Sequence, residues 1–202
     1  MDLSLSHFNG IVAHVYDFIL PKRKPVEFLD LLNAQRNDKI LEIGAGTGRI
    51  AKHYGFKVHD LTLLDPAENM LKRAITLIPH AKPVVGFSEQ MEFSSNTFDK
   101  IVCYDTLHHW QNQVKGLREA FRVLKPGGIL LVLEVDQNNF WGRKVQLLEN
   151  VLRMNSRMHK PFDLRLILEK IGYTNVIYDP TNNGLTYALV GTKPLIAKII
   201  KL

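Results

Sequence analysis

The sequence predicts an α/β fold with a mostly parallel sheet, and three observations carry this prediction. From Lys39 onward, short runs rich in Ile, Val and Leu alternate with segments of helical period. The first of these runs leads straight into a glycine-rich turn, which is typical of folds that bind a nucleotide-like ligand. With 202 residues, 46% of them hydrophobic, the chain has material for one substantial core. We therefore expect a single domain.

Each expected strand is a short apolar run bounded by turn residues. The five core strands are placed at residues 39–43, 61–65, 83–85, 100–104 and 129–135. Two more are placed near the end, at residues 175–178 and 186–190. The dipeptide Asn183-Gly184 between them is a turn signal, so these two strands are expected to pair as an antiparallel hairpin.

Four amphipathic helices are expected, and each is ended by a proline or a glycine. Their apolar or helical segments are Ile11, Val15, Phe18 and Ile19 before Pro21; residues 69–78 before Pro79; Val114, Leu117, Phe121 and Leu124 before Lys125-Pro126-Gly127-Gly128; and Leu164, Leu168 and Ile171 before Gly172.

Composition narrows the class of protein. No signal-peptide pattern opens the chain and no apolar run approaches the ~20 residues of a membrane span, so we expect a cytoplasmic protein without a membrane span. The single cysteine, Cys103, excludes an internal disulfide and a cysteine-built metal site, and no metal site is expected. A net charge of +6 would attract nucleic acid or another anion. The basic residues are scattered, however, with one short run at Lys22-Arg23-Lys24.

Gly44, Gly46 and Gly48 follow the first strand, and they give a polar, extended ligand clearance to lie against the backbone. A dinucleotide-binding turn needs its third glycine at position 49, which is Arg49 here. A phosphate-binding loop needs Gly-Lys-Ser or Gly-Lys-Thr, which is missing from this turn. The spacing therefore disfavours NAD and a nucleoside triphosphate.

Asp65 ends the second expected strand, 21 positions after Gly44 (65 − 44). A carboxylate there can accept hydrogen bonds from both hydroxyls of a ribose. The alternative is that Asp65 caps the helix that begins after Pro66. The glycine turn at this spacing favours the ribose role.

The segment Glu42-Ile43-Gly44-Ala45-Gly46-Thr47-Gly48 resembles the E/D-x-G-x-G-x-G motif of Rossmann-like, class I S-adenosylmethionine-dependent methyltransferases. Asp65 falls at the position of their ribose-binding acid. Three later segments are similar to this family in the same order, residues 98–103, 107–110 and 118–128, so the resemblance covers roughly residues 38–136. It implies a doubly wound, seven-stranded sheet, with S-adenosylmethionine as methyl donor and S-adenosylhomocysteine as product.

The resemblance also implies which residues hold the cofactor. Glu42 would support the turn, and the methionine part would lie over Gly44, Ala45, Gly46 and Gly48 and beside Cys103 and Tyr104. The adenine would lie near Pro66 and Ala67, with Phe87, Ser88 and Glu89 at its edge. Family members commonly have Gly-Asp-Ala-Glu in that last region. Because Phe87 cannot accept a hydrogen bond from the adenine amino group, either Glu89 substitutes or apolar packing holds the ring.

The segment after the fourth strand narrows the choice of methyl acceptor. Amino methyltransferases of nucleic acid or protein typically have Asn/Asp-Pro-Pro-aromatic there, whereas this chain has Tyr104-Asp105-Thr106-Leu107. Cytosine C5 methylation needs a nucleophilic cysteine, and Cys103 lies in an expected buried strand. Residues 7–17 and 184–194 resemble small-molecule methyltransferases related to the ubiquinone/menaquinone biosynthesis C-methyltransferases. A small, apolar or aromatic acceptor is therefore favoured.

Three residues are candidates for catalysis. Tyr16, on the N-terminal helix, would reach the sulfonium, or else pack as a core aromatic. His108 would orient the acceptor or its loop, or act as a general base, and Asp105 is an equal candidate. An insertion carries the apolar residues Trp141, Leu147, Leu148, Val151, Met154 and Met158, which would wall the acceptor pocket or pack in the core.

The expected organisation is one methyltransferase domain over residues 1–202. Residues 1–37 form a helical lid, residues 38–136 the cofactor-binding core, and residues 137–202 the insertion helices and closing strands. Two alternatives stay open beside a small-molecule methyltransferase, namely methylation of RNA or another macromolecule, and a catalytically silent cofactor-binding module. The sequence identifies neither the acceptor nor the oligomeric state.

Overall fold

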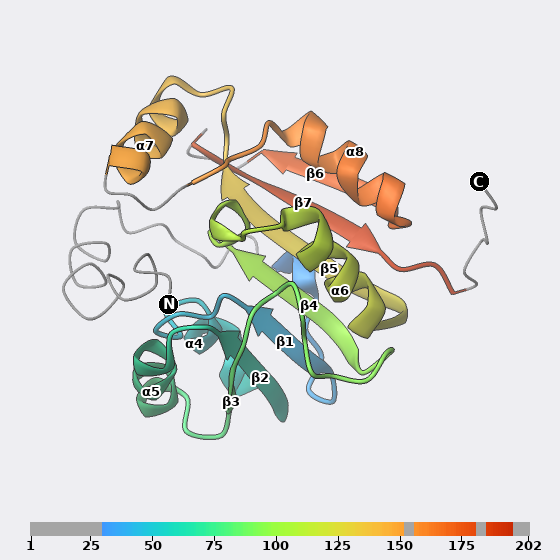
Figure 1. The fold of residues 1–202 in the computed structure, drawn as a ribbon. Coiled ribbons are helices and arrows are strands. Elements are labelled where there is room, and N and C mark those ends of the chain that lie inside the picture. Colours follow the sequence, from blue (N-terminus) through green and yellow to red (C-terminus); the bar gives the residue numbers. More distant parts are fainter. Residues whose placement is uncertain (1–29, 152–155, 181–184, 196–202) are drawn as a thin grey trace.

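The computed structural model describes residues 30–151, 156–180 and 185–195. They form a seven-stranded sheet in the order β3-β2-β1-β4-β5-β7-β6 (Figure 1). The strands, in that order, are Lys82–Val85, Asp60–Asp65, Lys39–Ile43, Phe98–Tyr104, Leu124–Val135, Thr186–Thr192 and Thr174–Pro180. The five neighbouring strands β3, β2, β1, β4 and β5 pair in parallel, and β7 runs antiparallel to both β5 and β6. The mostly parallel α/β sheet with a C-terminal antiparallel hairpin is confirmed.

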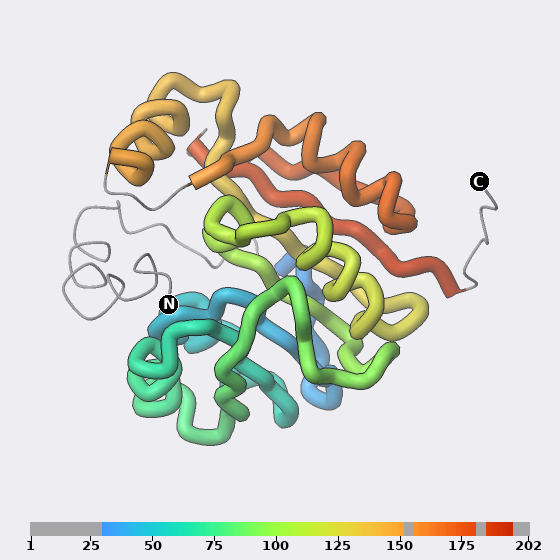
Figure 2. Tube along the Cα trace, in the orientation of Figure 1, coloured from blue at the N-terminus to red at the C-terminus, as the bar shows by residue number. Residues whose placement is uncertain are grey.

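Helices cover both faces of this sheet, as the trace of the chain shows (Figure 2). Residues of α4 (Ala51–Tyr54) and α5 (Glu68–Leu77) pack in one buried cluster, and residues of α6 (Gln113–Val123) and α8 (Pro161–Ile171) pack in the other. Neighbouring strand residues such as Ile40 and Leu41 point into opposite clusters. Because both faces are buried, the central strands read as continuous apolar runs.

Two expected boundaries near α6 are wrong. The helix ends at Val123, and Leu124 begins β5, so Lys125 to Gly128 lie within that strand rather than in a separate turn. A register shift between Phe98 and Lys100 accommodates the segment, and Gly127 N–H donates to the carbonyl of Lys193. Val114, expected on the buried face, is 40% exposed, because α6 instead buries Gly116, Leu117, Ala120 and Val123.

The helix α7 (Phe140–Val151) lies beyond the carboxyl end of β5, away from the faces of the sheet (Figure 1). Its expected pocket-lining residues Trp141, Leu147, Leu148 and Val151 are between 51% and 71% exposed, whereas Gly142 and Glu149 are buried. These four side chains are therefore not packed in the core, and whether they wall an acceptor pocket stays a prediction. Met154 lies outside the described residues.

Two parts of the prediction fall largely on undescribed residues. Tyr16 and residues 1–29 of the expected lid lie outside the described part of the chain. The turn at Asn183-Gly184 does too, although the pairing of the strands on either side of it is seen. No helix among the described residues has the length and hydrophobicity needed to cross a membrane.

Candidate cofactor and active site

The glycine turn follows β1 at the edge where the parallel strands end. Gly44, Gly46 and Gly48 all have positive φ, at 70°, 52° and 73°, which side-chain-bearing residues rarely adopt. A Cβ on Gly44 would lie 1.9 Å from Thr106 Oγ1, and one on Gly48 would lie 2.9 Å from Ala74 Cβ. A Cβ on Gly46 would have no atom of the described residues within 4 Å. Two glycines therefore serve internal packing, and Gly46 borders open space.

Asp65 fastens this turn to the end of β2. Its Oδ2 accepts from the backbone N–H of Gly46 and its Oδ1 from that of Ala67, both at 2.8 Å. The side chain is buried, and burial raises the pKa of its carboxyl group above the ordinary value. The N-cap residue of α5 is Ala67, whose side chain cannot form a capping hydrogen bond. Asp65 lies two residues earlier and accepts from the N–H of Ala67, so it contacts the start of the helix without being its N-cap. Each oxygen keeps a second lone pair for a ligand hydroxyl.

Glu42 lies under the turn, and its carboxylate accepts a hydrogen bond from the hydroxyl of Tyr54. Both side chains are about 2% exposed. Burial raises the pKa of Glu42 to about 8, against the lowering effects of the Tyr54 hydrogen bond and the charge of Arg49. Glu42 therefore links β1 to α4 beneath the turn, and its burial disfavours the ionised form of the carboxyl group.

The expected adenine-edge residues have distinct environments. Ser88 is buried and its hydroxyl donates to Glu89 Oε2 at 2.9 Å, while Glu89 Oε1 accepts from the backbone N–H of Asn112 at 2.9 Å. Phe87 is 45% exposed. Both oxygens of Glu89 are thus engaged within the protein, and Phe87 presents an accessible aromatic ring. Pro66 is exposed beyond Asp65.

The loop after β4 lies against the glycine turn. Ile43 of β1 pairs with Cys103 of β4, and the Thr106 side chain occupies the space beside Gly44. Asp105 adopts a left-handed conformation with φ 54°, which is unusual for a residue other than glycine and clusters at functional sites. Cys103 is fully buried, and burial raises the pKa of its thiol, so it is a packing residue.

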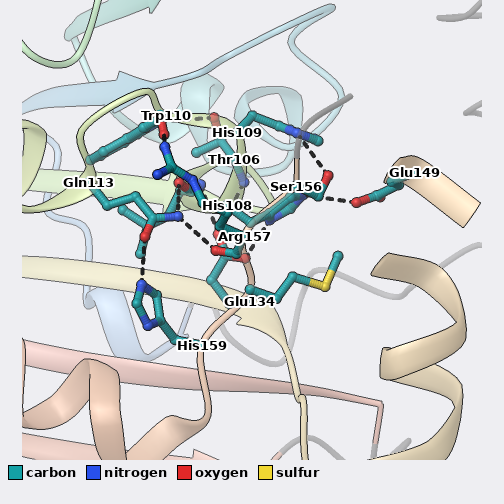
Figure 3. A network of polar contacts seen from close by, with 12 residues as sticks. Thr106, His108, His109, Trp110, Gln113, Glu134, Glu149, Ser156, Arg157 and His159 are labelled. Atoms are coloured by element: carbon teal, nitrogen blue, oxygen red, sulfur yellow. Dashed lines mark hydrogen bonds and ion pairs between the residues drawn. The ribbon is translucent and has the colours of Figure 1, made fainter. Parts of the chain in front are cut away.

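Glu134, near the end of β5, organises this loop. Its Oε1 accepts from the backbone N–H groups of Thr106 and Leu107 at 3.2 and 2.8 Å, and its Oε2 lies 2.5 Å from His108 Nδ1 (Figure 3). His108 is 1% exposed. Burial alone would lower its pKa, but the charge and hydrogen bond of Glu134, with Asp105 and Glu149 behind it, raise the pKa to about 9.

The segment after α7 is fastened to the same loop. Arg157 N–H donates to the carbonyl of His108, and its guanidinium donates to the carbonyls of Trp110 and Gln111. The amide of Gln113 donates to the carbonyls of Leu107 and Arg157, at 3.0 and 2.7 Å. Figure 3 shows these side chains converging on the loop. The post-β4 loop is therefore held from β5, from α6 and from the segment after α7.

The structure brings most of the expected residues to one edge of the sheet. The glycine turn, Asp65 and the loop with Asp105 and His108 gather where β1, β2 and β4 end. Sequence reasoning missed Glu134, Glu149 and Arg157. A signal for Glu134 was its carboxylate inside an otherwise apolar strand, where a buried charge needs specific partners.

Comparisons with known proteins agree with this geometry. A family model described as "Methyltransferase domain" matches residues 41–132. The ubiquinone/menaquinone biosynthesis C-methyltransferase UbiE of Cronobacter sakazakii is 34% identical over 121 residues, which are 55% of this chain and 48% of that protein. The chloroplastic 2-methyl-6-phytyl-1,4-hydroquinone methyltransferase 1 of Oryza sativa subsp. japonica is 30% identical over 109 residues, 51% of this chain and 32% of that protein. The matches thus span about half or less of these relatives.

Solved structures share the fold. The phosphoethanolamine N-methyltransferase 2 of Haemonchus contortus, solved with phosphomonomethylethanolamine and S-adenosylhomocysteine, superimposes with a TM-score of 0.72 at 16% identity. The match covers 85% of this chain and 52% of that one. Residues 41–132 therefore match a methyltransferase domain, and the strand order and the glycine turn of this chain are similar to those of Rossmann-like, class I S-adenosylmethionine-dependent methyltransferases.

Proposed function

We propose that this chain is an S-adenosylmethionine-dependent methyltransferase that acts on a small, apolar or aromatic molecule. One observation carries the proposal: the open space beside Gly46 adjoins the carboxylate of Asp65, which is fixed by two backbone N–H groups at the end of β2. An extended cofactor can lie over Gly46 because no side chain of the described residues occupies that position, while Asp65 can accept hydrogen bonds from its ribose hydroxyls.

The adenine end of the cofactor is assigned to the surface formed by Pro66, Ala67 and Phe87. Because both oxygens of Glu89 already accept hydrogen bonds within the protein, Glu89 is a poor substitute for the missing acid. An accessible Phe87 ring next to Ser88 instead supports the adenine by apolar packing. Phe87→Ala is therefore expected to weaken cofactor binding more than Glu89→Gln does.

S-adenosylmethionine held at Gly46 and Asp65 would supply an electrophilic methyl group for in-line displacement by the acceptor, with S-adenosylhomocysteine as the leaving group. The chain's own task is to align the acceptor and exclude water. We assign alignment to the loop after β4, which Glu134 holds in place and which adjoins the glycine turn. Asp105, half-buried at a left-handed position, is the candidate to contact the acceptor.

His108 is assigned a positioning role rather than that of a general base. It is 1% exposed, its Nδ1 is engaged by Glu134, and its Nε2 faces Glu149 at 3.7 Å. A general base must come within hydrogen-bond reach of the proton that it removes. His108 meets protein carboxylates on both ring nitrogens, so it acts on the acceptor through the loop. Tyr16 stays a candidate on the proposed lid, within one domain over residues 1–202.

The acceptor class rests on the relatives and on the loop sequence. The relative from Cronobacter sakazakii is named for ubiquinone and menaquinone biosynthesis and the one from Oryza sativa for a hydroquinone, which favours an aromatic ring as acceptor. The segment Tyr104-Asp105-Thr106-Leu107 lacks the Pro-Pro pair typical of enzymes that methylate amino groups on macromolecules. Hydroquinones with short apolar side chains are therefore the first acceptors to test.

Thermal unfolding with S-adenosylhomocysteine tests the cofactor site. A ligand that binds only the folded chain increases the free energy of unfolding, by about 2.7 kcal/mol when its concentration is a hundred times Kd, and so raises Tm. We expect Asp65→Asn to lose most of this shift. Asp60→Asn, a matched change at the other end of β2 where Asp60 pairs with Lys82, should keep it. Equal shifts in both variants would contradict the assignment of Asp65.

Transfer of labelled methyl groups tests the activity. Purified protein, labelled S-adenosylmethionine and a panel of hydroquinones are expected to give labelled product that is absent with Asp65→Asn. In a parallel reaction with RNA in place of the hydroquinones, label that appears in RNA and in no hydroquinone would contradict the proposed acceptor class. Cofactor binding without transfer to any acceptor would instead identify a silent module.

A further inference from the structure

We infer that His108, His109 and Glu149 form a binding site for one divalent first-row transition-metal ion such as Zn²⁺. One ligand atom from each of the three side chains lies within 4.8 Å of the others. Two imidazoles and one carboxylate are a ligand set that Zn²⁺ takes in proteins. Residues 108, 109 and 149 would hold the ion whether or not the chain transfers methyl groups.

The first support is the orientation of His108. Histidines that bind metal nearly always give their other ring N–H to a carboxylate or carbonyl, which fixes the tautomer and points the second nitrogen at the ion. Glu134 Oε2 lies 2.5 Å from His108 Nδ1 and fulfils this role. His108 Nε2, in a side chain that is 1% exposed, makes no hydrogen bond among the described residues and faces Glu149. A buried polar nitrogen in that position is costly unless an ion or a proton occupies the gap.

The second support is the placement of Glu149. It is 4% exposed, although α7 leaves the apolar side chains of Trp141, Leu147 and Leu148 in solvent. The helix is held close to the end of β5, since a Cβ on Gly142 would lie 2.1 Å from the carbonyl oxygen of Asp136. The packing of α7 thus buries a carboxylate and brings it toward His108, as Figure 3 shows.

The third ligand is also held in place. His109 Nδ1 lies 3.3 Å from Ser156 Oγ, a contact that orients the imidazole ring beside His108. Ser156 is in turn fixed by Asn150, whose Oδ1 accepts from Ser156 N–H at 2.6 Å and whose Nδ2 donates to the Ser156 carbonyl at 3.2 Å. Asn150 directly follows Glu149. The same turn of α7 therefore supplies one ligand and supports a second.

The buried groups around His108 suit a cation. Two carboxylates, Glu134 and Glu149, converge on its imidazole ring from opposite sides. A doubly charged ion bound to His108 and Glu149 would lie close to both negative charges, and buried charges are stabilised by such pairing. Typical Zn–N and Zn–O distances are about 2.0–2.2 Å, so binding requires the three side chains to draw slightly together. The ion would then cross-link α7 to the loop after β4.

Metal titration tests this inference without any measurement of turnover. We expect the apo protein to take up one equivalent of Co²⁺ with visible d–d absorption, to exchange it for Zn²⁺, and to gain Tm with Zn²⁺. His109→Ala and Glu149→Gln should each weaken Zn²⁺ binding at least tenfold. Glu134→Gln should weaken it by about 10–100-fold, the usual effect of removing a carboxylate that orients a ligating histidine. His53→Ala, which removes an exposed histidine on α4, should bind as the wild type does.

Circular dichroism and the metal-free Tm of each variant show whether it folds, and the conservative Glu149→Gln variant keeps the side-chain shape. Substoichiometric uptake by the wild type would overturn the site and identify the cluster as an imidazolium held between two carboxylates. Equal Zn²⁺ affinity in His109→Ala, Glu149→Gln and His53→Ala would overturn it as well, because the ion would then bind elsewhere.

Discussion

The hydroxyl of Tyr54 donates a hydrogen bond to the carboxylate of Glu42, and both side chains are buried beneath the glycine turn. Burial raises the pKa of Glu42 to about 8, whereas the same group in the unfolded chain titrates near 4.5. Between these values the folded protein holds a proton that the unfolded chain has released. The free energy of unfolding therefore falls as pH rises through this window.

We expect Glu42→Gln to remove this slope, because glutamine accepts the Tyr54 hydrogen bond and does not titrate. Each unit of pKa shift corresponds to about 1.4 kcal/mol, so the variant should gain on the order of 3–5 kcal/mol relative to the wild type between pH 5 and pH 8.5. Urea unfolding of both proteins across this range measures the difference. Parallel pH profiles would show that Glu42 titrates normally.

The three glycines of the turn should respond differently to alanine. Gly44→Ala combines positive φ with a contact of 1.9 Å to Thr106 Oγ1, so we expect a large loss of stability, well above the 1–2 kcal/mol of a left-handed alanine. Gly46→Ala meets no neighbour among the described residues and should lose only about 1–2 kcal/mol. Its Cβ would, however, enter the proposed cofactor space.

Thermal unfolding with and without S-adenosylhomocysteine separates these effects. Gly46→Ala should fold and lose the ligand-induced rise in Tm. The double variant Gly44→Ala with Thr106→Ala should recover part of the stability lost by Gly44→Ala alone, because the contacting hydroxyl is gone. If Gly46→Ala kept the full Tm rise, the cofactor would not lie over this turn.

The central strands β1, β2, β4 and β5 were predictable because each contains an apolar run in the part of the sheet that is buried on both faces. The site around His108 was not, because its partners come from distant segments. The motif predicted the glycine turn and Asp65, whose contacts lie within two consecutive βα units. Glu134 and Glu149 act on His108 from β5 and α7, and no local spacing relates them.

Core packing of the apolar residues of α7, one of the two expected roles, is wrong for a related physical reason. Helical spacing indicates which side chains share a face, but the face that turns inward depends on what the helix packs against. The inner neighbour of α7 is the polar loop with His108, so Glu149 is buried and Leu147 and Leu148 are exposed. In the sequence, the acidic Glu149 directly after Leu147 and Leu148 was the local sign that the inward face of this helix is polar.

Glu134→Gln should disturb the loop after β4, and with it methyl transfer, while leaving cofactor binding intact. A glutamine oxygen can still accept from Thr106 and Leu107 N–H, but its amide hydrogens would face His108 Nδ1. We expect a loss of about 1–3 kcal/mol, the usual cost of a disrupted buried hydrogen bond. Methyl transfer should slow, while the Tm rise with S-adenosylhomocysteine should persist, since Asp65 and Gly46 are untouched. Loss of that rise with unchanged apo stability would assign Glu134 to cofactor binding.

Lys193 joins the end of β7 to the end of α6. Its ammonium donates to the carbonyls of Phe121 and Leu124 at 2.8 and 2.7 Å and to Asn96 Oδ1 at 2.8 Å. These carbonyls lie where a helix leaves acceptors unpaired, and a cation near a helix C-terminus is favourable. Lys193→Met should therefore leave several acceptors unsatisfied, and we expect it to destabilise the fold by about 2–3 kcal/mol.

Lys125→Met is the matched control for Lys193→Met, because Lys125 pairs with Asp99 while both side chains remain substantially exposed. Exposed ion pairs contribute about 0–1 kcal/mol, so this variant should change stability little. Urea unfolding compares the two, and hydrogen exchange at residues 121–124 should speed up only in Lys193→Met. Equal losses in both variants would mean that the charge of Lys193, rather than the oxygen acceptors around its ammonium group, accounts for its effect.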